Sequence, residues 1–172
     1  FHSRYEGISL IAGNYCFIFV SPRFSGRMLF TLGHELGHLI ADHSNGVSAR
    51  FEKAKQIGSF GEGSKTEAFV DAFASCLLMP DTGLGKFLVL AREHLELDTN
   101  SITDRDILLI ARFFGVSFDV AGMRLEHLGL IPPGLTYNLA NYLRKEFGSP
   151  EKRADALGIG PRDRVIIPSI SP

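Results

Sequence analysis

The sequence contains no tryptophan and only two cysteines among its 172 residues. Two cysteines cannot supply the bridges that stabilise small secreted domains. Because Cys16 and Cys76 each lie within an apolar run, we expect buried thiols. No stretch approaches the roughly 18 consecutive apolar residues of a membrane span, and no charged-then-apolar leader opens the chain. These absences predict a cytoplasmic protein with no membrane partner.

An excess of charge of one sign is also missing. The chain carries 18 basic and 19 acidic residues, a net charge of −1 at pH 7, which disfavours a nonspecific nucleic-acid or anionic-membrane binder. Its length and its hydrophobic content of 45% are enough for one buried core, with or without an appendage. Because the sequence begins at Phe1 rather than at a methionine, a missing upstream module is one expectation.

The chain does have a short motif, His34-Glu35-Leu36-Gly37-His38. Residues four apart are neighbours on one helix face, so His34 and His38 can offer imidazole nitrogens to one metal ion. Glu35 lies one step round the helix, where a carboxylate can take a proton from a water that such an ion would bind. The motif therefore predicts a catalytic zinc site, with one zinc per chain and Glu35 as the base.

The residues around the motif predict a helix over 27–40 with Ser25 as its N-cap, because apolar residues recur there at three- and four-residue spacings. Gly33 and Gly37 interrupt this pattern. Each costs about 1 kcal/mol relative to alanine in a helix interior. Their spacing of four predicts that one face of the helix presses against another backbone.

A catalytic zinc needs a third protein ligand. A third histidine at the offset of the histidine-rich variant is missing, and His43, one residue out of register, is expected to cap the helix. Glu67 is the best carboxylate, because Asp71 follows four residues later on the same helical face and is placed to receive the free N–H of a liganding histidine. Ser64 to Glu67 also spells a capping box. The spacing leaves ligand and cap equally open.

Two strings, FTLGHELGHLI over 30–40 and EAFVDAFASCLLMP over 67–80, resemble the two signature blocks of the ImmA/IrrE family of metallopeptidases. The resemblance extends over roughly 8–80 and more loosely to 131. It implies that Glu35 is the catalytic base. It also implies a set of zinc ligands, which are His34, His38 and Glu67.

Two positions depart from the family pattern: Val70 and Asp71 stand where the family usually has alanine and asparagine. Neither change removes a ligand, and Asp71 resembles the Glu-x-x-x-Asp pattern of thermolysin-like enzymes. The family resemblance implies a zinc endopeptidase that cleaves a cognate helix-turn-helix transcriptional repressor and so derepresses phage, mobile-element or stress-response genes. The alternative is a non-catalytic metal-binding regulator that acts by binding DNA or a protein.

Two short apolar runs precede the motif. They cover 8–11 and 15–20 and are joined by Gly13-Asn14, which predicts a β-hairpin. An extended peptide substrate could add to the free edge of a strand there by main-chain hydrogen bonds, although a buried core strand is equally open. After the motif helix, the glycine-containing segment 44–64 predicts a surface connection or lid rather than a phosphate loop.

Further along, segment 101–131 has the apolar and glycine-turn pattern of a helix-turn-helix, which raises DNA binding as a rival function. Its charges are Arg105, Arg112 and Arg124 against Asp104, Asp106, Asp119 and Glu126. The predicted recognition helix over 118–128 has one arginine, and an acidic residue lies near its start, where DNA contacts normally fall. We therefore expect this segment to pack on the core, and its charge disfavours DNA binding.

These patterns predict an α+β fold: a mainly helical, zincin-like metallopeptidase with a small antiparallel sheet and a helix-turn-helix-like segment packed on it. We expect a metallopeptidase core over 1–100, the helix-turn-helix-like segment over 101–131, and a C-terminal helix with an extended tail over 132–172. Several side chains, which the sequence does not rank, are candidates for stabilising an oxyanion. They are Tyr5, Tyr15, Tyr137, Tyr142, His2 and His127.

Overall fold

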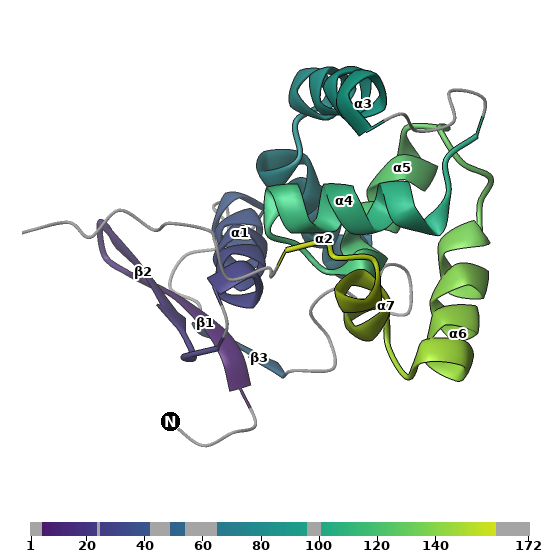
Figure 1. Ribbon diagram of the computed structural model, residues 1–172. Helices are drawn as coiled ribbons and strands as arrows, with labels where there is room; N and C mark the ends of the chain where they lie inside the picture. The colour runs from purple at the N-terminus through teal and green to yellow at the C-terminus, as the bar shows by residue number, and fades with distance from the viewer. Residues whose placement is uncertain (1–4, 24, 42–48, 54–64, 96–100, 161–172) are drawn as a thin grey trace, which may run out of the picture. The chain divides into compact units, whose positions relative to one another are not determined.

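The computed structural model describes residues 5–23, 25–41, 49–53, 65–95 and 101–160. Its contacts divide the chain into two compact units, Phe1–Leu78 and Met79–Pro172. Within the described residues, the first unit holds a small antiparallel sheet and two helices, and the second holds five helices (Figure 1). This is the mainly helical α+β architecture that the sequence predicts. The expected division at residues 100 and 131 stays a prediction about domain organisation.

The sheet of the first unit has the strand order β2-β1-β3 and is antiparallel throughout. Strand β1 (Tyr5–Ala12) pairs antiparallel with β2 (Tyr15–Val20), which confirms the predicted hairpin. The turn between them contains Gly13 in a left-handed conformation, with φ of 61°. Strand β3 (Ala49–Lys53) lies within segment 44–64, which the sequence predicts to be a surface connection or lid. The glycine-rich end of that segment lies outside the described residues. In the described sheet β1 is therefore central, whereas β2 and β3 are edge strands.

Both cysteines are exposed, so the expectation of buried thiols is wrong. Cys16 lies on the edge strand β2, next to the hairpin turn. Cys76 lies on α2 (Lys65–Leu78), one residue beyond the buried positions 70, 71, 74 and 75. An apolar run marks an element that has a covered face, but it does not say which residues of the run lie on that face.

The helix that carries the metal-binding motif, α1 (Ser25–Ala41), packs against α2 through its two glycines. A Cβ atom added to Gly33 would lie 3.3 Å from Cβ of Ala74, and one added to Gly37 would lie 3.0 Å from Cβ of Val70. The two helices therefore approach more closely than larger side chains would allow. This close approach confirms the prediction drawn from the glycine pair.

The second unit consists of α3 (Asp81–Leu95), α4 (Asp104–Phe114), α5 (Phe118–His127), α6 (Leu135–Phe147) and α7 (Pro150–Ala156). The first residue after α4 is Gly115, which adopts a left-handed conformation with φ of 68°. Ser117 then caps α5 by accepting a hydrogen bond of 3.1 Å from the Val120 amide. Helices α4 and α5 thus form the predicted helix-turn-helix, whereas α3 and α7 were not anticipated from the sequence.

The core of the second unit is built from apolar side chains of α3, α4, α5 and α6. The most deeply buried of them include Leu84, Ile107, Ile110, Phe118, Leu125 and Leu143.

Among the described residues, no single helix has the length and apolar content needed to cross a membrane, and α2 and α3 meet that requirement only when taken together as a bent pair.

Candidate metal centre

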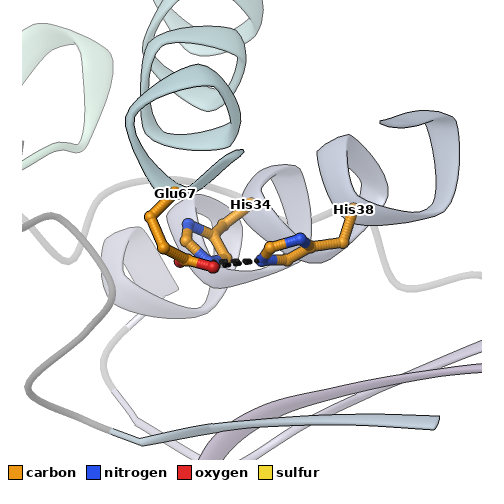
Figure 2. A group of neighbouring side chains, drawn as sticks. All are labelled: His34, His38 and Glu67. Atoms are coloured by element: carbon orange, nitrogen blue, oxygen red, sulfur yellow. Dashed lines mark hydrogen bonds and ion pairs between the residues drawn. The ribbon is translucent and has the colours of Figure 1, made fainter. Parts of the chain in front are cut away.

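Helices α1 and α2 bring three potential metal ligands to one point. His34 and His38 come from α1, and their Nε2 atoms lie 3.2 Å apart. Glu67 comes from the first turn of α2, and its carboxylate oxygens lie 3.4 Å from Nε2 of His34 and 3.5 Å from Nε2 of His38. Figure 2 shows the two rings and the carboxylate pointing toward one another. One ligand atom from each residue lies within 4.8 Å of the others, so the three form a candidate metal-binding triad.

Burial of this triad is uneven. The side chains of both histidines are buried, whereas 13% of the Glu67 side chain is exposed. Two ring nitrogens and a carboxylate that share a buried point give up much of their contact with water, and a bound cation would offset that loss. Two nitrogen donors and one oxygen donor are also the ligand set of many catalytic zinc sites. The residues present therefore fit a divalent metal.

The Glu67 side chain had two interpretations from spacing, as a ligand and as part of a capping box. Helix α2 begins at Lys65, so Glu67 does lie in the first turn. Ser64, the other half of the box, lies outside the described residues. The contact of the Glu67 carboxylate with both imidazoles favours the ligand interpretation.

Asp71, one helical turn after Glu67, is hydrogen-bonded to the ring nitrogen of His34 that does not face the triad. Its Oδ1 atom lies 2.8 Å from Nδ1 of His34, and both side chains are fully buried. Because a carboxylate can only accept this hydrogen bond, the proton of the ring lies on Nδ1. The lone pair of His34 is therefore left on Nε2, the atom that faces the triad. This is the contact expected from the four-residue spacing between Glu67 and Asp71.

Glu35 lies on another face of α1 and is fully buried against β1, where its carboxylate approaches Gly7. A second contact joins the same two elements, because Arg27 donates a hydrogen bond of 2.5 Å from Nε to the carboxylate of Glu6. The sequence predicts neither contact. No local pattern reports them, since they depend on how the strand lies across the helix.

The remaining candidates from the sequence are distributed over both units. Tyr5 and Tyr15 belong to the unit that holds the triad, and the side chain of Tyr15 is 71% exposed at the start of β2. Tyr137, Tyr142 and His127 belong to the other unit. His2 and His43 lie outside the described residues.

In this mainly helical α+β fold, two helices bring together a His-His-Glu triad, which is the ligand set of thermolysin-like zinc metallopeptidases. Comparison with known families agrees, because residues 9–126 match the family model of the M78 peptidases, described as the IrrE N-terminal-like domain. The match covers more than half of the chain, and the chain therefore belongs to this metallopeptidase family. No curated protein matched the chain in the comparison made with them.

Proposed function

We propose that this chain is a zinc-dependent endopeptidase in which His34, His38 and Glu67 hold one zinc ion. The convergence of these three side chains from two helices carries the proposal. Among the described residues the group of potential ligands has three members. A structural zinc site is normally closed by four protein ligands, whereas a catalytic site keeps one position open for water or substrate. The ligand set therefore supports chemistry rather than a purely structural role.

The protein groups around this site divide the work of peptide hydrolysis. When bound, zinc would lower the pKa of a bound water to about 7 and polarise a carbonyl oxygen. Glu35 accepts the proton of the attacking water and then delivers it to the leaving amine. Asp71 holds the ring of His34 in the tautomer whose Nε2 atom is free to bind a metal. The burial of Glu35 and both histidines keeps bulk water away from these groups.

The substrate we propose is a cognate helix-turn-helix repressor, whose cleavage in the cytoplasm derepresses phage, mobile-element or stress-response genes. Membership of the IrrE-like family supports this choice. The sheet supplies a means of binding, because β2 and β3 are edge strands of the described sheet and an extended peptide can pair with the backbone of such a strand.

The alternative is a non-catalytic metal-binding regulator that acts by binding DNA or a protein, and DNA binding would use α4 and α5. Arg124, the one arginine of α5, is 6% exposed and donates a hydrogen bond of 3.2 Å to the carbonyl of Met79. It also pairs with Asp81. Asp119, at the start of α5, pairs with Arg144 at 3.2 Å. These contacts support a packing role for α5, because its arginine is used inside the unit and its first turn carries a negative charge.

Cleavage of the repressor encoded beside the gene tests the proposal. The repressor would be incubated with the wild-type chain and with Glu35→Gln, each with and without a chelator, and the products identified by mass spectrometry. We expect wild type to cut at one or a few sites, and we expect both the chelator and Glu35→Gln to suppress cutting. The glutamine keeps the shape of the side chain but cannot take the proton, a loss of about 10²–10⁴-fold in rate. Cutting that persists in Glu35→Gln would rule out Glu35 as the base.

A further inference from the structure

We propose that Gly7 is a positioning residue for Glu35: its missing side chain provides the space that the Glu35 carboxylate occupies. The role of Glu35 as a base rests on the proposed function, whereas the contact itself does not. A Cβ atom added to Gly7 would lie 2.8 Å from both Cγ and Cδ of Glu35, and nearer still to Oε1. Carbon atoms in contact are normally separated by about 3.5–4.0 Å. Any larger residue at position 7 therefore overlaps Glu35.

Glu35 has little room to avoid such an overlap. Its side chain is fully buried, and the clash would involve Cγ as well as the end of the carboxylate. A surface glutamate would turn into solvent at small cost, but a buried one has to displace its neighbours or leave its rotamer. A larger residue at position 7 would therefore displace the Glu35 carboxylate, which is the group that accepts the proton in the proposed reaction.

Strand β1 is held in place by its contacts with α1 and β2. Glu6 precedes Gly7 and pairs with Arg27 of α1 through its carboxylate. The backbone carbonyl of Glu6 also accepts a hydrogen bond of 2.8 Å from the Ser21 amide. Gly7 lies directly opposite Val20 in the β1–β2 register. Since these contacts join β1 to both β2 and α1, the strand is less free to withdraw than the side chain of Glu35 is to shift.

A β-bulge adds to this local arrangement. On the β3 side, Tyr5 pairs with Lys53 and Gly7 pairs with Glu52, so Glu6 is an extra residue in β1. Bulges of this kind redirect side chains and are frequent beside active sites. Here the bulge precedes the residue that lies against Glu35, and both Glu6 and Gly7 are buried. The irregular strand and the absent side chain therefore occur together at the proposed base.

The other close glycines of this unit have a different consequence. Gly33 and Gly37 contact Ala74 and Val70 of α2, so larger residues there would push two helices apart. At Gly7 a larger residue would displace the Glu35 carboxylate instead. The three atoms nearest to a Cβ at Gly7 all belong to Glu35, and none belongs to His34 or His38. We therefore expect substitution of Gly7 to reduce the rate while zinc stays bound.

The first test compares Gly7→Ala with Ser9→Ala, a change at a buried position on the same face of the same strand. Zinc content of each variant would be measured by elemental analysis, and kcat and KM by cleavage of the repressor. We expect Gly7→Ala to keep about one zinc and to lose on the order of 10²-fold in kcat with little change in KM, because small displacements of a catalytic group have effects of that size. Ser9→Ala should retain kcat within about twofold. An unchanged kcat in Gly7→Ala overturns the proposal.

The second test needs no substrate. Thermal unfolding of the metal-free chain would be measured for Gly7→Ala, for Glu35→Ala, and for the double variant. We expect Gly7→Ala to lower Tm by about 2–10 °C when Glu35 is present and by much less when Glu35→Ala has opened the space. If Gly7→Ala alone does not fold, folding of the double variant supports the proposal, and failure of both overturns it.

The two tests keep the proposals apart. An equal loss of Tm in both backgrounds means that the added methyl group meets something other than Glu35, and it overturns the role of Gly7 whether or not the chain cuts its substrate. A wild-type chain that binds zinc but cuts no repressor contradicts the proposed function alone. In that case the unfolding measurements still decide whether Gly7 holds Glu35 in place.

Discussion

Two helix pairs in this chain, α1 with α2 and α4 with α5, each follow a recognisable sequence motif, and they use their polar side chains in opposite ways. In the first pair, His34, His38 and Glu67 come from different helices and converge on one point. In the second pair, Asp106 accepts hydrogen bonds of 2.8 and 2.7 Å from the amide and hydroxyl of Thr103 and so closes the start of α4. The first pair builds a site, whereas the second stabilises its own helix ends.

The charged residues of α5 show the same contrast. Arg124 donates a hydrogen bond to the Met79 carbonyl and pairs with Asp81, both at the start of the second unit. Glu126 accepts hydrogen bonds of 2.9 and 2.8 Å from the amides of Gly134 and Thr136 at the start of α6. A motif therefore indicates a function when its polar atoms are directed at a shared point, and indicates structure when they are satisfied by neighbouring backbone.

The largest effect is expected on zinc content when Glu67 is replaced, because Glu67 is either a metal ligand or a helix cap. Glu67→Ala should reduce zinc from about one ion per chain to nearly none, because a ligand is removed. Loss of a helix cap would instead cost only about 0.5–2 kcal/mol of stability and leave the metal in place. Elemental analysis after dialysis measures this, with Glu151→Ala, a glutamate in the first turn of α7, as the matched control. Full zinc occupancy in Glu67→Ala would return Glu67 to a capping role.

The next effect concerns the hydrogen bond behind the first histidine. Asp71→Ala should weaken zinc binding by roughly 10–100-fold, as is typical when a carboxylate that orients a liganding histidine is lost. Asp71→Asn should lose less, since its amide oxygen can still accept the proton of His34. Competition with a chromophoric chelator measures both affinities, and Asp119→Ala serves as a control on an exposed aspartate. Equal affinity in wild type and Asp71→Ala would leave Asp71 as an ordinary buried residue of α2.

A smaller effect separates packing from DNA readout in the second helix pair. Arg124→Ala should lower the free energy of unfolding by about 1–2 kcal/mol, because it removes charged hydrogen bonds and a buried side chain. Arg105→Ala, at an exposed position of α4, should stay within about 0.5 kcal/mol of wild type. Urea unfolding measures both. Unchanged stability of Arg124→Ala, together with weakened binding to the DNA upstream of the gene, would reverse the comparison.

The smallest effect is a pH dependence. Burial tends to raise the pKa of Glu126, but hydrogen bonds from Thr136 and Gly134 outweigh it and hold the pKa below its ordinary value of 4.5. The lowered pKa means that this carboxylate stabilises the fold above about pH 4.5 and loses that contribution as pH falls through its folded pKa. Because this carboxylate is partly exposed and screened by solvent, its contribution should be at most about 0.3–1 kcal/mol, as for other carboxylates at helix starts.

Glu126→Gln tests this pH dependence, because it keeps the shape and one acceptor oxygen but does not titrate. Urea unfolding at a series of pH values should show a shallower loss of stability below pH 4.5 in the variant than in wild type. Parallel curves for the two proteins would show that Glu126 has the same pKa folded and unfolded.

Much of the metal centre was predictable because its signals are local. The spacing of His34 and His38 fixes their shared helix face, and the glycine pair Gly33 and Gly37 anticipates the close approach of α2. The pairing of Asp71 with His34 also follows from spacing, once α2 is known to be helical. These features need only the period of a helix and the chemistry of the side chains.

Other features were not predictable because they depend on which faces meet. The exposure of Cys16 and Cys76 depends on the covered sides of β2 and α2, which an apolar run does not specify. The contact of Gly7 with Glu35 depends on how β1 lies across α1. Strand β3 is short and lies in a glycine-containing segment that has the composition of a loop. Tertiary packing decides all of these cases.

We propose that His34, His38 and Glu67 hold a zinc ion and that Glu35, which is not a ligand, acts as the base. A crystal structure of the zinc-loaded chain, with anomalous diffraction measured on both sides of the zinc absorption edge, tests it most directly. We predict one strong anomalous peak within about 2.0–2.2 Å of Nε2 of both histidines and of a Glu67 oxygen, with Glu35 outside the coordination sphere. A peak coordinated by Glu35, or a zinc ion bound elsewhere with this triad empty, would contradict the account.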